Sequence, residues 1–151
     1  MKKHIVKSFN LDHTQVTAPF IRLADEIPAP NGGIIVKLDL RFTQPNKEFM
    51  DMPAMHTLEH LLATYLREGG KYNIIDLSPM GCQTGFYLTM FGPVDLAEFK
   101  EFFIACLRRV LAAREIPGVD EKECGNYRSH SLLNAQKFAA DFLNANAEIM
   151  K

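Results

Sequence analysis

The chain has 151 residues, of which 47% are hydrophobic and 23% charged, and its net charge is −1. This length fits a single domain spanning 1–151, because about 150 residues bury close to 70% of their extended surface. The balanced charge argues against a nucleic-acid partner, and no apolar run approaches the roughly 18 residues that cross a membrane.

The first third of the chain is predicted to be extended. Residues 3–11 alternate loosely between apolar and polar side chains, and closely spaced Pro and Gly residues at 28–33 predict a turn. Residues 34–42 alternate with the period of two that is typical of a half-buried strand. Arg41 is expected at the polar end of that strand.

The rest of the chain is predicted to contain three helices and two strands. Pro53 begins an amphipathic helix that ends near Glu68, where two glycines follow. The other predicted elements are strands at 74–77 and 86–91 and helices at 94–113 and 131–145. This order predicts an α+β fold, in which one domain has a mostly antiparallel β-sheet with helices packed on one face.

The most informative motif is H-T-L-E-H at 56–60. Residues four apart lie on one face of a helix, so the imidazoles of His56 and His60 can bind the same metal ion. Glu59 projects beside that site, where a carboxylate is suited to moving protons as a general acid or base. The alternative, two solvated histidines on a helix surface, is less consistent with the apolar helix around them.

A catalytic metal site usually needs a third protein ligand, which must come from elsewhere in the chain. Cys124 is the natural candidate, because it lies in the polar segment E-K-E-C-G-N-Y, where a thiolate can be exposed. His130 is a weaker competitor for the same position. Two imidazoles and one thiolate accept Zn²⁺ or Fe²⁺, and the ligand types alone do not decide between them.

The three cysteines are predicted to differ in their surroundings. They form no C-x-x-C pair, and the N-terminal sequence lacks the apolar segment of a secretory signal, so we expect reduced thiols in the cytoplasm. Cys82 lies on a glycine-rich bend, S-P-M-G-C-Q-T-G, where a thiol near a cation can act as nucleophile or proton carrier. The alternative for Cys82 is a thiol packed in the sheet. Cys106 lies on an apolar helical face and is predicted to belong to the core.

Six segments carry a resemblance to a known family. They are S-F-N-L-D-H-T (8–14), A-P (18–19), D-L-R-F-T-Q-P-N-K (39–47), H-T-L-E-H-L (56–61), I-I-D-L-S-P-M-G-C-Q-T-G-F-Y-L (74–88) and E-C-G-N-Y (123–127). In this order they resemble the S-ribosylhomocysteine lyase (LuxS) family, the autoinducer-2 synthases, over almost the whole chain. The S-P-M-G-C-Q-T-G and H-T-L-E-H motifs together are highly specific.

The resemblance implies an enzyme, a carbon–sulfur lyase that acts as a cytoplasmic homodimer with active sites at the subunit interface. Its substrate would be S-ribosylhomocysteine, and its products L-homocysteine and 4,5-dihydroxypentane-2,3-dione, the autoinducer-2 precursor of quorum sensing. The homocysteine belongs to the activated methyl cycle. One divalent metal ion per subunit is implied, Fe²⁺ in the cell, with Zn²⁺ or Co²⁺ as substitutes.

The resemblance also implies roles for individual residues. By position the metal ligands are His56, His60 and Cys124, the catalytic residues are Cys82 and Glu59, and the residues around the substrate are Ser8, His13, Arg41 and Asp76. The thioether bond is broken by β-elimination after two metal-assisted carbonyl shifts, because elimination needs a carbonyl beta to the sulfur. Cys82, as thiolate, would carry the carbon-bound protons, and Arg41 would favour the thiolate.

Two other functions fit parts of the sequence. The motif also matches H-x-x-E-H, the inverted zincin pattern of metallopeptidases, in which Glu59 would activate water. That function leaves Cys82 unused. A non-catalytic site closed by His56, His60 and Cys124 is the second alternative, but structural zinc prefers four protein ligands, and the sequence offers no evident fourth.

Overall fold

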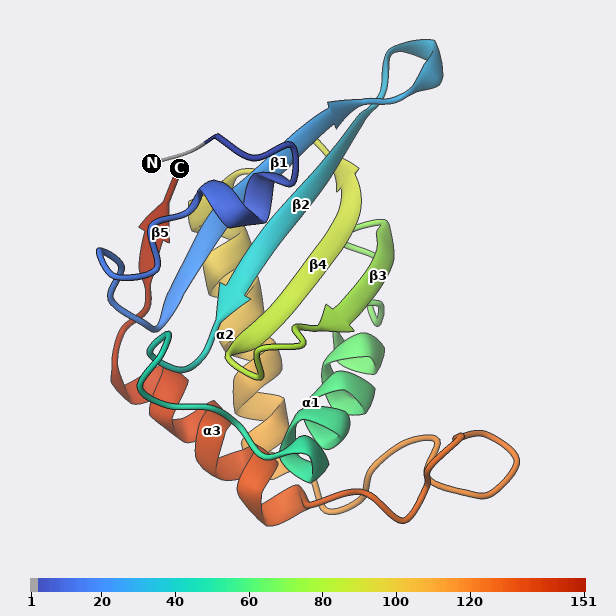
Figure 1. Cartoon of the computed structure of the whole chain (residues 1–151). Helices are drawn as coiled ribbons and strands as arrows, with labels where there is room; N and C mark the ends of the chain where they lie inside the picture. The colour runs from blue at the N-terminus through green and yellow to red at the C-terminus, as the bar shows by residue number, and fades with distance from the viewer. Residues whose placement is uncertain (1–2) are drawn as a thin grey trace.

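One five-stranded sheet forms the centre of the fold (Figure 1). A computed structural model describes residues 3–151. The strands, in chain order, are β1 (Phe20–Pro28), β2 (Ile34–Arg41), β3 (Ile74–Pro79), β4 (Gly85–Gly92) and β5 (Glu148–Met150). Their order across the sheet is β3-β4-β2-β1-β5, and every neighbouring pair is antiparallel except β1 with β5. The predicted α+β fold with a mostly antiparallel sheet is confirmed.

Three helices cover one face of the sheet (Figure 1). They are α1 (Met52–Tyr65), α2 (Leu96–Ala112) and α3 (Leu132–Asn144), each within three residues of its predicted limits. Each helix begins at a side chain that accepts hydrogen bonds from free backbone amides of the first turn, and these caps are Asp51, Asp95 and Ser131. No helix of residues 3–151 is long and apolar enough to pass through a bilayer.

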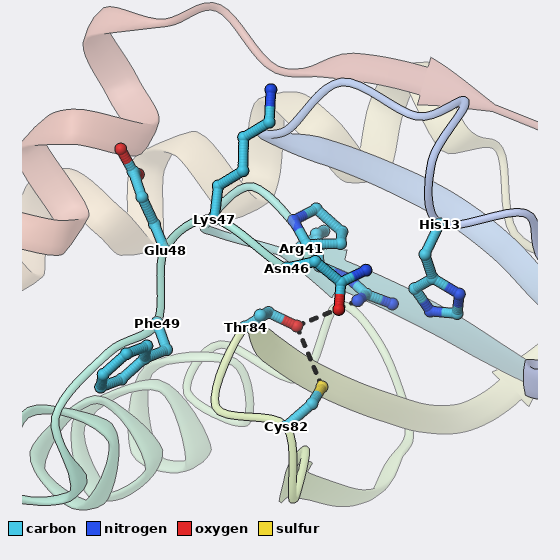
Figure 2. A pocket seen from close by; sticks show the side chains of 9 residues that line it. His13, Arg41, Asn46, Lys47, Glu48, Phe49, Cys82 and Thr84 are labelled. Atoms are coloured by element: carbon cyan, nitrogen blue, oxygen red, sulfur yellow. Dashed lines mark hydrogen bonds between the residues drawn. The ribbon is translucent and has the colours of Figure 1, made fainter.

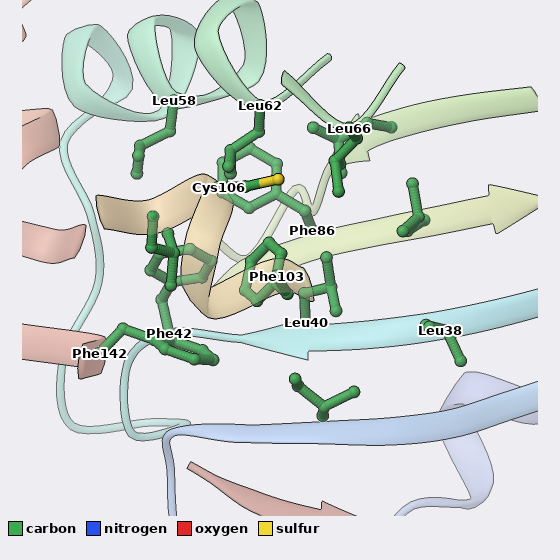
Figure 3. Packing of buried hydrophobic residues seen from close by; sticks show 14 of the residues in the cluster. Leu38, Leu40, Phe42, Leu58, Leu62, Leu66, Phe86, Phe103, Cys106 and Phe142 are labelled. Atoms are coloured by element: carbon green, nitrogen blue, oxygen red, sulfur yellow. The ribbon is translucent and has the colours of Figure 1, made fainter. Parts of the chain in front are cut away.

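The apolar core lies between the sheet and the helices (Figure 3). Alternate side chains of β2 and β4 point toward it, and α1 and α2 contribute leucines and phenylalanines that are fully buried. Burial of one such side chain stabilises the fold by about 1.5–3 kcal/mol. Cys106 lies in this core and is 2% exposed, as predicted. At Gly85 a Cβ would lie 2.3 Å from the Leu40 carbonyl oxygen, so close packing of β4 on β2 requires glycine.

The structure differs from the sequence prediction in three places. Residues 3–11 are not a strand but contain a 3₁₀ turn, η1 (Lys7–Asn10), because β1 already pairs with β2 and β5 on its two sides. The strand at 148–150 was not predicted, since three residues are too short for a periodic pattern. The turn at 28–33 is confirmed and contains η2 (Pro30–Gly32).

The third difference concerns the polar face of β2. The sequence predicts a half-buried strand, yet Asp39 is fully buried and Arg41 is 1% exposed. These two side chains lie on the same face of β2 and form an ion pair with a distance of 2.8 Å between Nη2 and Oδ2. Mutual neutralisation makes the burial of both charges possible.

Candidate metal centre and thiol pocket

Four side chains with metal-binding atoms meet between α1 and the segment that precedes α3. The ligand atoms of His56, His60, Cys124 and His130 all lie within 4.8 Å of one another. The Cys124 Sγ is 3.4 Å from His56 Nε2 and 3.9 Å from His130 Nε2. The expected meeting of Cys124 with the two α1 histidines is thus present, and the group could hold a metal ion.

Backbone carbonyls orient the two histidines of α1. His56 Nδ1 donates to the Ser129 carbonyl at 2.9 Å, and His60 Nδ1 donates to the Pro117 carbonyl at 2.8 Å. A carbonyl only accepts hydrogen bonds, so each Nδ1 carries the ring hydrogen and each Nε2 keeps its lone pair. In metal sites, the ring nitrogen of histidine that does not bind the metal commonly donates in this way, and the hydrogen bond fixes the orientation of the imidazole.

His130 is held in a different way. Its ring stacks on His56 at a centroid distance of 3.9 Å, and its Nδ1 lies 3.1 Å from the Thr57 hydroxyl. The Thr57 oxygen accepts from the Ser131 amide at 2.9 Å, and Thr57 is fully buried. Among residues 3–151, the atom placed to accept the hydroxyl hydrogen of Thr57 is His130 Nδ1. When the Thr57 hydroxyl donates to Nδ1, which gives its hydrogen a partner, the ring hydrogen of His130 resides on Nε2, which faces the Cys124 sulfur.

The donor set fits a catalytic metal ion better than a structural one. His130 supplies the fourth side chain that was not evident in the sequence, but in the tautomer that accepts from Thr57 its Nε2 carries a hydrogen and offers no lone pair to a metal. Two imidazole lone pairs and one thiolate remain, with an open fourth position. Burial next to the His56 and His60 imidazoles lowers the pKa of His130 to about 4, so its ring is neutral at pH 7.

Glu59 lies beside this group without being one of its members. Its Oε2 is 3.8 Å from His60 Nε2, and both side chains line a shallow cavity of about 360 Å³ next to Gly118. A carboxylate in this position can exchange protons with a molecule bound at the metal-facing side of His60.

A second cavity, the thiol pocket, lies around Cys82 (Figure 2). Its volume is about 530 Å³, and its lining includes His13, Arg41, Cys82, Thr84 and residues of the segment 45–49. Cys82 is exposed and lies in the turn between β3 and β4, so the alternative of a thiol packed in the sheet is wrong. His13 and Arg41 thus share a cavity with Cys82, as a common substrate site requires.

The floor of the thiol pocket is a buried hydrogen-bond network. Arg41 donates to both carboxylate oxygens of Asp39, at 3.1 and 2.8 Å, and to the Thr84 hydroxyl at 3.0 Å. Burial opposes the charge of Arg41, but the hydrogen bonds and charge of Asp39 outweigh it, and the pKa of Arg41 is raised. No sequence motif pointed to a role for Asp39 or Thr84, although the D-L-R spacing does place Asp39 and Arg41 on one face.

Comparison with known proteins adds the family. The sequence model described as S-ribosylhomocysteinase (LuxS) matches residues 6–151. The chain belongs to the S-ribosylhomocysteinase family. The predicted resemblance is confirmed.

Several bacterial S-ribosylhomocysteinase relatives cover nearly the whole chain. A protein of Helicobacter pylori strain Shi470 is 50% identical over 143 residues, which span 95% of this chain and 92% of the relative. Proteins of Staphylococcus saprophyticus and Staphylococcus aureus strain bovine RF122 are 48% and 49% identical over 148 residues, spanning 98% of this chain and 94% of each relative. All three are named S-ribosylhomocysteine lyase, and the chain is accordingly an enzyme, a carbon–sulfur lyase.

The structure does not bring every predicted site residue together within one chain. In residues 3–151, the metal-binding group and Glu59 are not part of the lining of the thiol pocket. Ser8 lines a separate cavity of about 200 Å³ with Lys7 and Asp25. Asp76 lies on β3, where its carboxylate accepts a hydrogen bond from Ser78. The predicted residues therefore fall into two main groups, with Ser8 and Asp76 outside both.

Proposed function

We propose that the chain is a metal-dependent S-ribosylhomocysteine lyase that forms L-homocysteine and 4,5-dihydroxypentane-2,3-dione, the autoinducer-2 precursor. The observation that carries this proposal is the group of His56, His60 and Cys124, found in a chain of the S-ribosylhomocysteinase family. The substrate is taken from the names of the relatives. The whole of 1–151 acts as one catalytic domain, and we expect it in the cytoplasm.

His56, His60 and Cys124 would hold one divalent ion per subunit, Fe²⁺ in the cell, with Zn²⁺ or Co²⁺ as substitutes. When bound, this ion acts as a Lewis acid that stabilises negative charge developing on the sugar oxygens. His130 would donate its Nε2 hydrogen toward the Cys124 sulfur and so hold the sulfur beside the two α1 imidazoles.

The proton transfers are assigned to Cys82 and Glu59. As a thiolate, Cys82 removes a proton from one sugar carbon and returns it to the neighbouring carbon, so the carbonyl moves along the chain. Glu59 then removes the proton next to the final carbonyl, the carbon–sulfur bond breaks, and homocysteine leaves as a thiolate that takes up a proton. His13, Arg41, Ser8 and Asp76 would bind the substrate.

The active enzyme would be a homodimer with its sites at the subunit interface. This arrangement is supported by the separation of the thiol pocket from the metal-binding group within one chain. Large apolar side chains are exposed next to the thiol pocket and at the first turns of α1 and α3: Phe49 is 68% exposed, Met52 54% and Leu133 78%. A second copy that covers these side chains could bring its metal-binding group to the thiol pocket of the first.

A thiol-trapping assay tests the proposed function. Reduced, metal-loaded protein should release a free thiol from S-ribosylhomocysteine, and a complete lack of release would contradict the proposal. The variant Cys82→Ser should keep the metal and lose turnover, whereas His60→Ala should lose both. Peptide hydrolysis that survives Cys82→Ala would instead favour the metallopeptidase, and unfolding on chelation would favour a structural metal.

A further inference from the structure

Thr84 connects the buried Arg41 to the thiol of Cys82 (Figure 2). The Thr84 hydroxyl oxygen is 3.0 Å from Arg41 Nη1 and also 3.0 Å from Cys82 Sγ. Thr84 is buried, whereas Cys82 is exposed at the edge of the thiol pocket. One hydroxyl group therefore lies between a fixed positive charge and a reactive sulfur.

The chemistry of arginine fixes the direction of one hydrogen bond and leaves the Thr84 hydroxyl hydrogen available for the other. A guanidinium only donates, so the Thr84 oxygen must accept from Arg41. The hydroxyl hydrogen is then free for the other partner, which is the Cys82 sulfur. A sulfur that accepts a hydrogen bond from a buried donor is stabilised as a thiolate more than as a thiol.

Arg41, at the other end of this hydrogen-bond network, is held in place by Asp39. Asp39 accepts two hydrogen bonds from Arg41 and a third from Arg22 at 3.1 Å. Two guanidinium groups thus share one carboxylate, which leaves a net positive charge beneath the thiol pocket. The positive charge polarises the Thr84 hydroxyl and strengthens its donation to sulfur.

We propose that Thr84 is a positioning residue that holds Cys82 in the thiolate form by donating its hydroxyl hydrogen to the sulfur. The thiol proton passes to water at the exposed sulfur, and Thr84 keeps its own hydrogen throughout. The other titratable side chains that line the pocket are His13, Lys47 and Glu48. The inference rests on the proposed function only for the use that the enzyme makes of this thiolate.

The pH dependence of alkylation tests the proposal without any substrate. The three cysteines fall on different tryptic peptides, 72–100, 101–108 and 123–128, so mass spectrometry can follow iodoacetamide labelling of Cys82 alone. In Thr84→Val the pH of half-maximal labelling rate should rise by about one to two units, the size expected for losing a hydrogen bond to a charged group. Thr84→Ser keeps the hydroxyl and should restore the wild-type midpoint.

Thr43→Val is the matched control. Thr43 is also buried, and its hydroxyl donates to the Glu48 carbonyl at 3.1 Å instead of to Cys82. Its removal should leave the labelling midpoint of Cys82 unchanged. An equal shift in Thr43→Val would show a general effect of losing a buried hydroxyl and would overturn the proposal.

A wild-type labelling midpoint of Cys82 in folded Thr84→Val would also overturn the proposal. If the valine variant does not fold by circular dichroism, Thr84→Ala is measured instead, since its smaller side chain admits water to the Arg41 N–H. Thiol release from S-ribosylhomocysteine is recorded separately. A shifted midpoint in a protein without lyase activity contradicts the proposed function and supports the role of Thr84, and an active lyase without the shift contradicts Thr84 alone.

Discussion

Thr57 of α1 and His130 in front of α3 are joined by a hydrogen bond of 3.1 Å, and donation by the Thr57 hydroxyl places the hydrogen of His130 on Nε2. His56 and His60 are fixed in the opposite sense, because their Nδ1 atoms donate to carbonyls. Three neighbouring imidazoles of the same residue type are thereby given different chemistry by their partners. Two offer a lone pair to a metal, and the third offers an N–H to the Cys124 sulfur.

The first prediction separates a metal ligand from its supporting residue. His130→Gln should still bind one metal ion per chain, because glutamine keeps an N–H donor and three ligands remain. Its affinity should fall about tenfold, the lower end of the effect of outer partners. His60→Ala and Cys124→Ala should lose the ion after desalting. Elemental analysis and chelator competition measure both quantities, and a metal-free His130→Gln would mean that His130 is itself a ligand.

The second prediction tests the hydrogen bond from Thr57 directly. Thr57→Val removes the donor to His130 Nδ1, so the ring is free to take either tautomer. The Co²⁺ affinity should therefore fall by about tenfold. Thr64→Val is the control on the same helix, since the Thr64 hydroxyl donates to the His60 carbonyl of its own helix. That variant should bind Co²⁺ as wild type does. Equal behaviour of the two variants would rule out the role of Thr57.

The third prediction concerns the proposed interface site. Cys82→Ser and His60→Ala are each expected to be inactive, yet co-expression should restore about one quarter of wild-type activity. Half of randomly paired dimers contain one subunit of each kind, and only one of their two sites then has both Cys82 and His60. No recovery, with mixed dimers shown by native mass spectrometry, would mean that each subunit supplies its own site.

The pairing of His56 with His60 was predictable because helical spacing alone places them on one face. The helix forms where the sequence indicates it, capped by Asp51. The position of Cys124 beside the two histidines was not predictable from periodicity, since the segment between α2 and α3 has no regular secondary structure. Its position depends on hydrogen bonds such as those from His56 and His60 to backbone carbonyls, and a sequence pattern contains no record of these.

The network beneath the thiol pocket was only half predictable. Alternation along β2 places Asp39 and Arg41 on the same face, but it predicted that this face would be polar and accessible. Irregular segments that carry His13 and Asn46 line the pocket above Arg41. Burial by irregular segments leaves no periodic signal, so the roles of Asp39 and Thr84 needed the structure.

The fourth prediction is a pH dependence of stability that Cys106 causes. Burial raises the pKa of Cys106 to about 11 from its ordinary 9.0. In alkaline solution the unfolded chain therefore loses this proton first, and the free energy of unfolding falls as pH rises from 9.0 toward about 11. One proton contributes a slope of at most about 1.4 kcal/mol per pH unit. Below pH 9.0 this contribution is fully present.

Urea unfolding at several alkaline pH values measures that slope. Cys106→Ala should be less stable than wild type near neutral pH but should show a flatter decline above it. Val110→Ala is the control, because it opens a cavity at a fully buried position of the same helix and removes no titratable group. Its slope should equal that of wild type. The same slope in Cys106→Ala would contradict the assignment to Cys106.

The last prediction compares two glycines that share a left-handed backbone. Gly118 has φ +68° and Gly69 φ +81°, so alanine at either position should cost about 1–2 kcal/mol of unfolding free energy. They differ in their surroundings. A Cβ at Gly118 would lie 3.4 Å from His60 Nδ1, whereas nothing lies within 4 Å of one at Gly69.

Only Gly118→Ala should therefore weaken metal binding, because the new methyl group would touch the nitrogen that donates to the Pro117 carbonyl while the backbone beside that carbonyl leaves its left-handed conformation. A loss of up to about tenfold in Co²⁺ affinity is expected, the lower end of the effect of changing a partner of a metal-binding histidine. Chelator competition on both folded variants gives the affinities, and urea unfolding gives the stabilities. Wild-type affinity in Gly118→Ala would show that the segment carrying Pro117 moves aside without turning His60, and that this carbonyl does not control the orientation of the ligand.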